Sequence, residues 1–106
     1  MSAPPTVADL VHAGVRRTDA ARVRACARYD RGALPPIEWR TAMAALYARE
    51  SRWWAVLLRA TVADHTIPLV YIAAVGAAQA AARHHAEEWE RGATEYARLT
   101  TTVGVG

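Results

Sequence analysis

A helical repeat that extends from Pro36 to Leu99 constrains the fold of this chain more than any other feature of its sequence. In the second half of this stretch, residues of one face follow at alternating intervals of four and three positions: Tyr71, Val75, Ala78, Ala82, His85, Trp89, Gly92, Tyr96 and Leu99. The first half has the same spacing in Trp39, Met43, Leu46, Glu50, Trp53, Leu57 and Ala60. A half-buried strand would alternate every second residue, so the pattern predicts two long helices.

A polar turn at Asp64-His65-Thr66 divides this stretch, and a proline suits the first turn of each helix, Pro36 for the first and Pro68 for the second. We expect helices at about 36–63 and 67–98 that form an antiparallel hairpin, with opposed residue numbers that sum to about 131. Four large rings then lie opposite small residues: Trp53 opposite Ala78, Trp54 opposite Ala77, Trp89 opposite Ala42 and Trp39 opposite Gly92. Interdigitated cores require this match of large with small.

A third helix is predicted before the hairpin, at about 7–32. Thr6 suits its N-cap with Asp9 as the acid of a capping box, and Gly32 suits its C-terminal end. Thr18-Asp19 is a possible break, but we favour one continuous or slightly kinked helix. We expect this helix to lie in the groove of the hairpin.

The length of 106 residues suits one domain. We expect a disordered lead over 1–6, a single helical domain over 7–99 and a flexible tail over 100–106. The predicted fold class is all-α, a small antiparallel three-helix bundle dominated by the long C-terminal hairpin. Helices of about 30 residues span roughly 45 Å, so one companion leaves much of each face uncovered. We therefore expect a homo-oligomer, most simply a dimer, or a protein partner.

Composition bears on the location of the protein. Residues 66–82 carry no charge, but this run is shorter than the roughly 20 residues of a membrane helix and consists largely of alanine, so we expect no membrane insertion. The N-terminus lacks the basic and apolar regions of a secretory signal. The single cysteine, Cys26, fits a reducing compartment. These features favour a cytoplasmic location.

One cluster of possible metal ligands stands out, His84-His85-Ala86-Glu87-Glu88, with His84, His85 and Glu88 as the candidate ligands. A metal site needs three or four ligands, and di-metal helices carry Glu-x-x-His, whereas here the histidines come first. We expect no metal and no cofactor. The sequence also lacks a nucleophile with its base, a phosphate-binding glycine loop and a metal-binding cysteine spacing, so an enzyme is not expected.

Two polar residues, Glu50 and His85, occupy positions of the helical repeat that should be apolar. The predicted register places them about one turn apart across the hairpin. A buried carboxylate and imidazole tolerate burial when they bond to each other, so we expect a buried polar pair. Such a pair would fix the register of the helices, and we favour that interpretation over catalysis.

All 13 basic residues are arginines, and the positive charge is concentrated in one segment. Residues 16–31 hold six arginines and two aspartates, net +4, whereas the remaining residues hold seven arginines and eight acids, net −1. Four of the arginines share one arc of the first helix: Arg17, Arg24, Arg28 and Arg31. This stripe could follow phosphates, or it could be solvated or paired with acids of this or another subunit.

The C-terminal segment Thr100-Thr101-Thr102-Val103-Gly104-Val105-Gly106 changes to β-branched residues and glycine. It is interpreted as a frayed end or as an extended peptide that docks on a partner through Val103 and Val105. The leading hypothesis for the chain is a non-enzymatic helical interaction or assembly protein, an adaptor or accessory subunit that self-associates. The alternative is a nucleic-acid-binding accessory protein that uses the arginine stripe.

Overall fold

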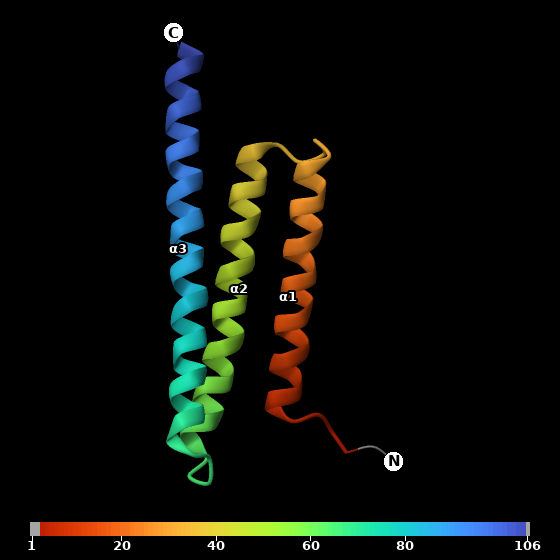
Figure 1. Ribbon diagram of the computed structural model, residues 1–106, viewed down its shortest axis with the longest axis vertical. Helices are drawn as coiled ribbons and strands as arrows, with labels where there is room; N and C mark the ends of the chain where they lie inside the picture. The colour runs from red at the N-terminus through yellow and green to blue at the C-terminus, as the bar shows by residue number, and fades with distance from the viewer. Residues whose placement is uncertain (1–2, 106) are drawn as a thin grey trace.

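The chain folds as an all-α bundle of three helices (Figure 1), and the computed structural model describes residues 3–105, with side chains over 3–102. Helix α1 spans Val7–Asp30, α2 spans Pro36–Ala63 and α3 spans Leu69–Val105. The predicted bounds of α2 are confirmed, α1 ends two residues earlier than predicted, and α3 begins two residues later. Residues 3–105 contain no strand.

Both ends of α1 are closed by local hydrogen bonds. The Asp9 amide donates to Thr6 Oγ1 at 3.1 Å and the Thr6 amide donates to Asp9 Oδ2 at 3.0 Å, which is the predicted capping box. At the other end Gly32 has φ +74°, and the Ala33 amide donates to the Arg28 carbonyl at 2.8 Å. A residue with a side chain is disfavoured in this left-handed conformation, so glycine ends the helix.

Helix α1 is continuous through Thr18, where a break was considered. The Thr18 hydroxyl donates to the Gly14 carbonyl at 2.8 Å, one turn earlier, and Thr18 is only 1% exposed. This bond satisfies the buried hydroxyl inside the helix, so threonine does not need to act as a cap here.

The C-terminal end of α3 differs from the prediction, because the helix continues to Val105 instead of ending near 98. The hydroxyls of Thr100 and Thr102 donate to the carbonyls of Tyr96 and Arg98, one turn earlier. These bonds let threonine remain in a helix despite its β-branched side chain. The described backbone is therefore helical from Thr100 to Val105, beyond the predicted end of this helix.

The predicted register of the α2–α3 hairpin is confirmed by three pairs. Gln79 Nε2 donates to Ser51 Oγ at 3.5 Å, the Tyr47 and His85 rings lie 5.1 Å apart, and the Trp39 and Trp89 rings lie 5.0 Å apart. The residue numbers in these pairs sum to 130, 132 and 128, close to the predicted sum. The hairpin therefore forms with the expected alignment.

Two tryptophans of α2 pack on α1, which the predicted pairing across the hairpin did not include. Trp53 packs on Gly14 of α1, since a Cβ built on Gly14 would lie 2.1 Å from Trp53 Cε2. Trp39 stacks on Tyr29 of α1 at 4.1 Å and meets the edge of Trp89, whereas the nearest side chain to Gly92 belongs to Arg40. The reason is that the prediction paired α2 with α3 alone, whereas α1 also packs against the tryptophans of α2.

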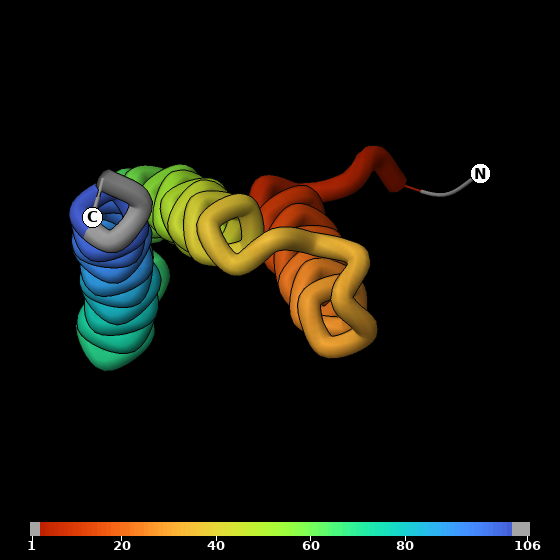
Figure 2. Tube along the Cα trace, turned by 90° about the horizontal axis from the view of Figure 1, so that it is seen from above, coloured from red at the N-terminus to blue at the C-terminus, as the bar shows by residue number. Residues whose placement is uncertain are grey.

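The three helices form an open layer with α2 in the middle (Figure 2). The backbone of α1 lies close to that of α2, and no described part of α1 comes as close to α3. The layer measures 62 × 31 × 15 Å. The expectation that the first helix fills the groove of the hairpin is therefore wrong: α1 lies beside α2, and the groove stays open.

Few side chains are fully buried in so thin a layer. The buried apolar residues are Val11, Ala25, Leu34, Met43, Ala82 and Ala86. One cluster joins Ala25, Leu34 and Met43, with Trp39, Tyr47 and Trp89 packed against it. This cluster connects all three helices near the end where α2 begins.

Candidate functional site

The half-buried carboxylate of Glu50 pairs with α1. Arg22 Nη1 donates to Glu50 Oε1 at 2.7 Å, and Trp54 Nε1 donates to Glu50 Oε2 at 3.2 Å. The two charged side chains are only 14% and 16% exposed, and Arg22 Nη2 also donates to Asp19 at 3.1 Å. The predicted pair of Glu50 with His85 is therefore wrong, because Arg22 supplies the charge that neutralises Glu50.

His85 instead lies on the Tyr47 ring, and its side chain is 52% exposed. The Arg22 guanidinium lies 4.4 Å from the centre of the same Tyr47 ring. Arg22 belongs to α1 and His85 to α3, so both outer helices approach α2 from one side of the layer. His85 stays half exposed because α1 does not reach α3 to cover it.

We define the central groove as the open channel around Tyr47. Its lining on α1 and α2 consists of Arg22, Val23, Cys26, Ala27, Asp30, Met43 and Tyr47, and His85 stands at its α3 edge. Val23 is 64% exposed in this groove although its side chain is wholly apolar. The groove thus combines a paired charge, a phenol ring and apolar side chains that remain in contact with water.

The histidine cluster on α3 is an exposed set of side chains. Glu88 Oε1 lies 2.9 Å from His84 Nε2, and Glu88 Oε2 lies 3.9 Å from His85 Nδ1. The three side chains are 63%, 51% and 52% exposed for His84, Glu88 and His85. Among the described residues no group of three or more histidine, cysteine or acidic side chains has the geometry to hold a metal ion.

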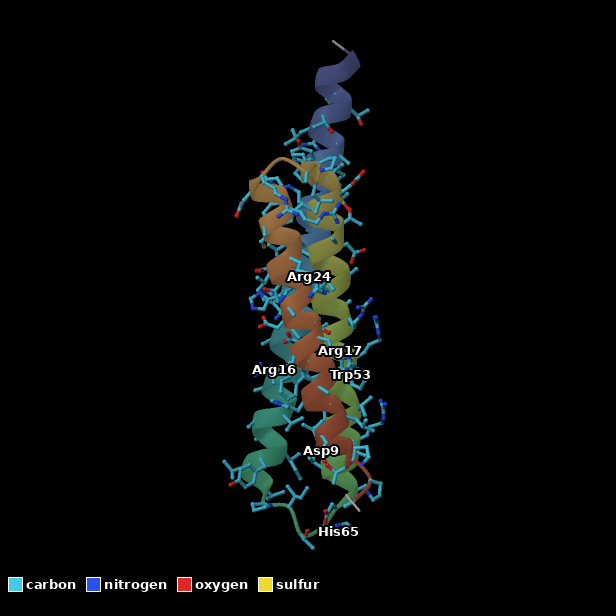
Figure 3. The ribbon with its side chains drawn as sticks, turned by 90° about the vertical axis from the view of Figure 1, so that its right-hand side faces the viewer. Asp9, Arg16, Arg17, Arg24, Trp53 and His65 are labelled. Atoms are coloured by element: carbon cyan, nitrogen blue, oxygen red, sulfur yellow. The ribbon has the colours of Figure 1, made fainter. Side chains whose placement is uncertain are left out.

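The four predicted arginines lie on the surface of α1 and at its end. Arg17, Arg24, Arg28 and Arg31 are all exposed, and Arg31 is the C-cap residue. Figure 3 shows Arg17 beside Trp53 at the junction of α1 and α2, with Arg24 farther along α1 and Arg16 on its other side. The Arg17 guanidinium lies 6.0 Å from the centre of the Trp53 ring.

Two more arginines belong to the same surface and were missed from the sequence. Arg49 and Arg52 of α2 line a shallow hollow together with Trp53 and Val56. Trp53 is the residue on which Arg17 lies, so the arginines of both helices share one apolar ring. The spacing of Arg49, Arg52 and Val56 indicates that they share one side of α2. Only the position of α1 shows that this side lies next to the arginines of α1.

The last candidate, docking through Val103 and Val105, concerns side chains outside the described residues. Their backbone belongs to α3, which is helical there and not extended.

No described helix has the length and apolar character required to cross a membrane. Comparison with protein-family models, with curated proteins and with solved structures finds no match for this chain. The structure therefore defines an all-α protein whose three helices form an open layer.

Proposed function

We propose that the chain is a non-enzymatic helical assembly protein that self-associates, with a second copy covering the central groove. The observation that carries the proposal is the surplus of exposed surface on an open layer. The layer is 15 Å thick, against about 10–12 Å for one helix with its side chains, so it is one layer of helices and every helix keeps sides that no other part of the chain covers.

The surplus can be estimated from general size relations. A compact monomer of 11.5 kDa exposes roughly 5,800 Å², whereas this chain exposes 7323 Å². Its radius of gyration is 17.6 Å, against about 13 Å for a compact domain of this length. The difference in surface is roughly 1,500 Å², and a stable interface buries about 800 Å² on each partner. The uncovered area is therefore large enough for a dimer.

Apolar side chains contribute to this surface. The exposed large apolar residues are Val7, Leu10, Val23, Val62, Leu69, Val70, Tyr71 and Leu99. In the central groove, Val23 and the half-buried Cys26 lie beside the Arg22–Glu50 pair, whose charges already neutralise each other. Covering Val23 and Cys26 removes apolar surface from water, which is favourable, and the Arg22–Glu50 pair leaves no uncompensated charge in the covered face.

A second copy fits this face by area and by charge. Helix α1 carries five arginines and three aspartates, net +2, whereas α3 carries three arginines and four glutamates, net −1. A twofold axis parallel to the helices would place α1 of one copy over α3 of the other, so that the flanks have opposite charge. Each groove would then cover the other.

Sedimentation equilibrium tests the proposal. The parent chain should have twice its 11.5 kDa mass at micromolar concentration. Val23→Asp places a charge in the groove on an exposed position, so it should give monomers while the helical circular dichroism is unchanged. Val62→Asp is the matched control, because Val62 is also exposed but lies at the far end of α2, about 22 Å along the helix from Tyr47. A monomeric parent, or equal effects of the two variants, would contradict the proposal.

A further inference from the structure

We propose that the outer face of α1 and α2 binds the phosphodiester backbone of a nucleic acid. The binding residues are Arg17, Arg49 and Arg52 beside the Trp53 ring, and Arg24 and Arg28 farther along α1. This outer basic face is separate from the central groove and does not depend on self-association.

Direct contacts join the two helices at this face. Trp53 lies against Gly14, which has no side chain to hold α1 away, and Arg17 extends over the ring at 6.0 Å from its centre. Arg49 and Arg52 line the hollow beside the same ring. One aromatic surface is therefore surrounded by three guanidinium groups that come from two helices.

The α1 arginines continue this surface as a row. Arg17 and Arg28 are eleven residues apart, or about 16 Å along a helix, and Arg24 lies between them. Arg24 and Arg28 are a like-charge pair four residues apart, which weakens an isolated helix by a few tenths of a kcal/mol. A polyanion that runs along the row would remove this repulsion.

The acids of the neighbouring helices do not neutralise these five arginines. Asp19 and Glu50 both pair with Arg22, Asp9 closes the capping box, and Asp30 lines the central groove. No ion pair within residues 3–102 joins any of the five arginines to an acid. Helices α1 and α2 together hold nine arginines and five acids, net +4, whereas α3 has net −1, so the positive charge lies on the two helices that form this face.

The chemistry of the face favours nucleic acid over a membrane. Guanidinium groups bind phosphate oxygens in a bidentate manner, and an aromatic ring beside them offers a stacking surface for a base. Surface helices that bind membranes insert exposed apolar side chains next to their basic residues. Here the three most exposed large apolar residues lie elsewhere: Leu69 and Val70 on α3, and Val23 in the central groove. Leu10, two turns before Arg17 on α1, is 51% exposed and is a single apolar side chain beside the arginine row.

Fluorescence anisotropy with a labelled single-stranded oligonucleotide and with its duplex tests the inference. If about four phosphates are neutralised, affinity should fall roughly 100-fold between about 50 and 200 mM salt. Arg24→Gln/Arg28→Gln and Arg49→Gln/Arg52→Gln should each weaken binding and lower the salt slope by about 1 to 2. Arg83→Gln/Arg91→Gln is the matched control, since it removes the same charge from exposed positions of α3.

Three results would overturn the inference. The first is a control variant that loses as much affinity as the other two, which would mean that net charge alone causes binding. The second is an Arg49→Gln/Arg52→Gln variant with parental affinity, which would exclude α2 from the site. The third is arginine-dependent binding to anionic lipid vesicles with none to either oligonucleotide. Sedimentation of the same variants keeps this test separate from self-association, because affinities are then compared between proteins whose oligomeric mass is known.

Discussion

Replacement of Gly14 by alanine tests the packing of α1 on α2 most sharply. In a helix, alanine is normally favoured over glycine by about 1 kcal/mol. At Gly14, however, an added Cβ would lie 2.1 Å from Trp53 Cε2 and 2.5 Å from both Cδ2 and Cζ2. These atoms belong to the rigid indole ring and not to the end of a flexible chain, so the ring or the helix must move by more than about 1 Å.

Overpacking of this kind costs about 1–3 kcal/mol. After the gain in helix propensity is subtracted, we expect Gly14→Ala to lower the free energy of unfolding by up to about 2 kcal/mol. For a chain of this size the midpoint of thermal unfolding should fall by up to about 15 °C. Gly76→Ala is the control, because the nearest atom to its added Cβ is Leu58 Cδ1 at 4.0 Å, an ordinary contact. It should raise stability by about 0.5–1 kcal/mol.

Both variants can be measured by thermal and urea unfolding, followed by circular dichroism at equal protein concentration. The expected result is a change of opposite sign at the two glycines. In the Trp53→Leu background the cost of Gly14→Ala should shrink, since the ring that blocks the Cβ is gone. If Gly14→Ala stabilises the chain as much as Gly76→Ala does, Trp53 does not pack on α1 as described.

Two further predictions concern charged groups. Glu50→Gln should destabilise the fold by about 1–3 kcal/mol. In double-mutant cycles measured by urea unfolding, Glu50→Gln and Arg22→Gln should show a coupling energy of at least about 1 kcal/mol, while the effects of Glu50→Gln and His85→Gln should add within about 0.5 kcal/mol. Coupling to His85 in place of Arg22 would refute the pairing of Glu50 with Arg22. The hydrogen bond from the Thr6 backbone amide, followed by that to the Thr6 side chain, holds the pKa of Asp9 below its usual value. The stabilising contribution of the ionised Asp9 carboxylate is therefore present above a pH of about 4 and is lost as the pH falls through the lowered pKa. In an NMR titration, Thr6→Ala should raise the Asp9 pKa toward its usual value. An unchanged pKa would contradict the capping box.

Local signals were sufficient to predict the helices. Pro36 sets the start of α2, and Thr6 with Asp9 sets the start of α1. Gly32 follows the end of α1, which lies within two residues of the predicted position. The register of the hairpin followed from the position of its turn near His65 and Thr66, which fixes the residues that face each other in two antiparallel helices. These features depend on residues that are neighbours in sequence or on a single helix pair, and therefore a pattern can predict them.

The position of α1 could not be predicted in this way, and the errors at the site follow from it. Arg22 lies on the side of α1 that packs against α2, which was the available signal that it meets a buried acid, and Gly14 within a helix was the signal for a close approach. Neither residue identifies its partner without the crossing of the two helices. Because α1 lies beside α2 and not over the hairpin, His85 is half exposed and Glu50 bonds to Arg22.

The most direct test of the central claim, that a second copy covers the central groove, uses the single cysteine of the chain. Cys26 lines this groove and is half-buried in one copy. The rate of its alkylation by iodoacetamide should fall as the protein concentration rises through the range in which dimers form, and Val23→Asp should keep the fast rate at every concentration. An alkylation rate that does not change while sedimentation shows dimers would place the interface elsewhere and contradict the account.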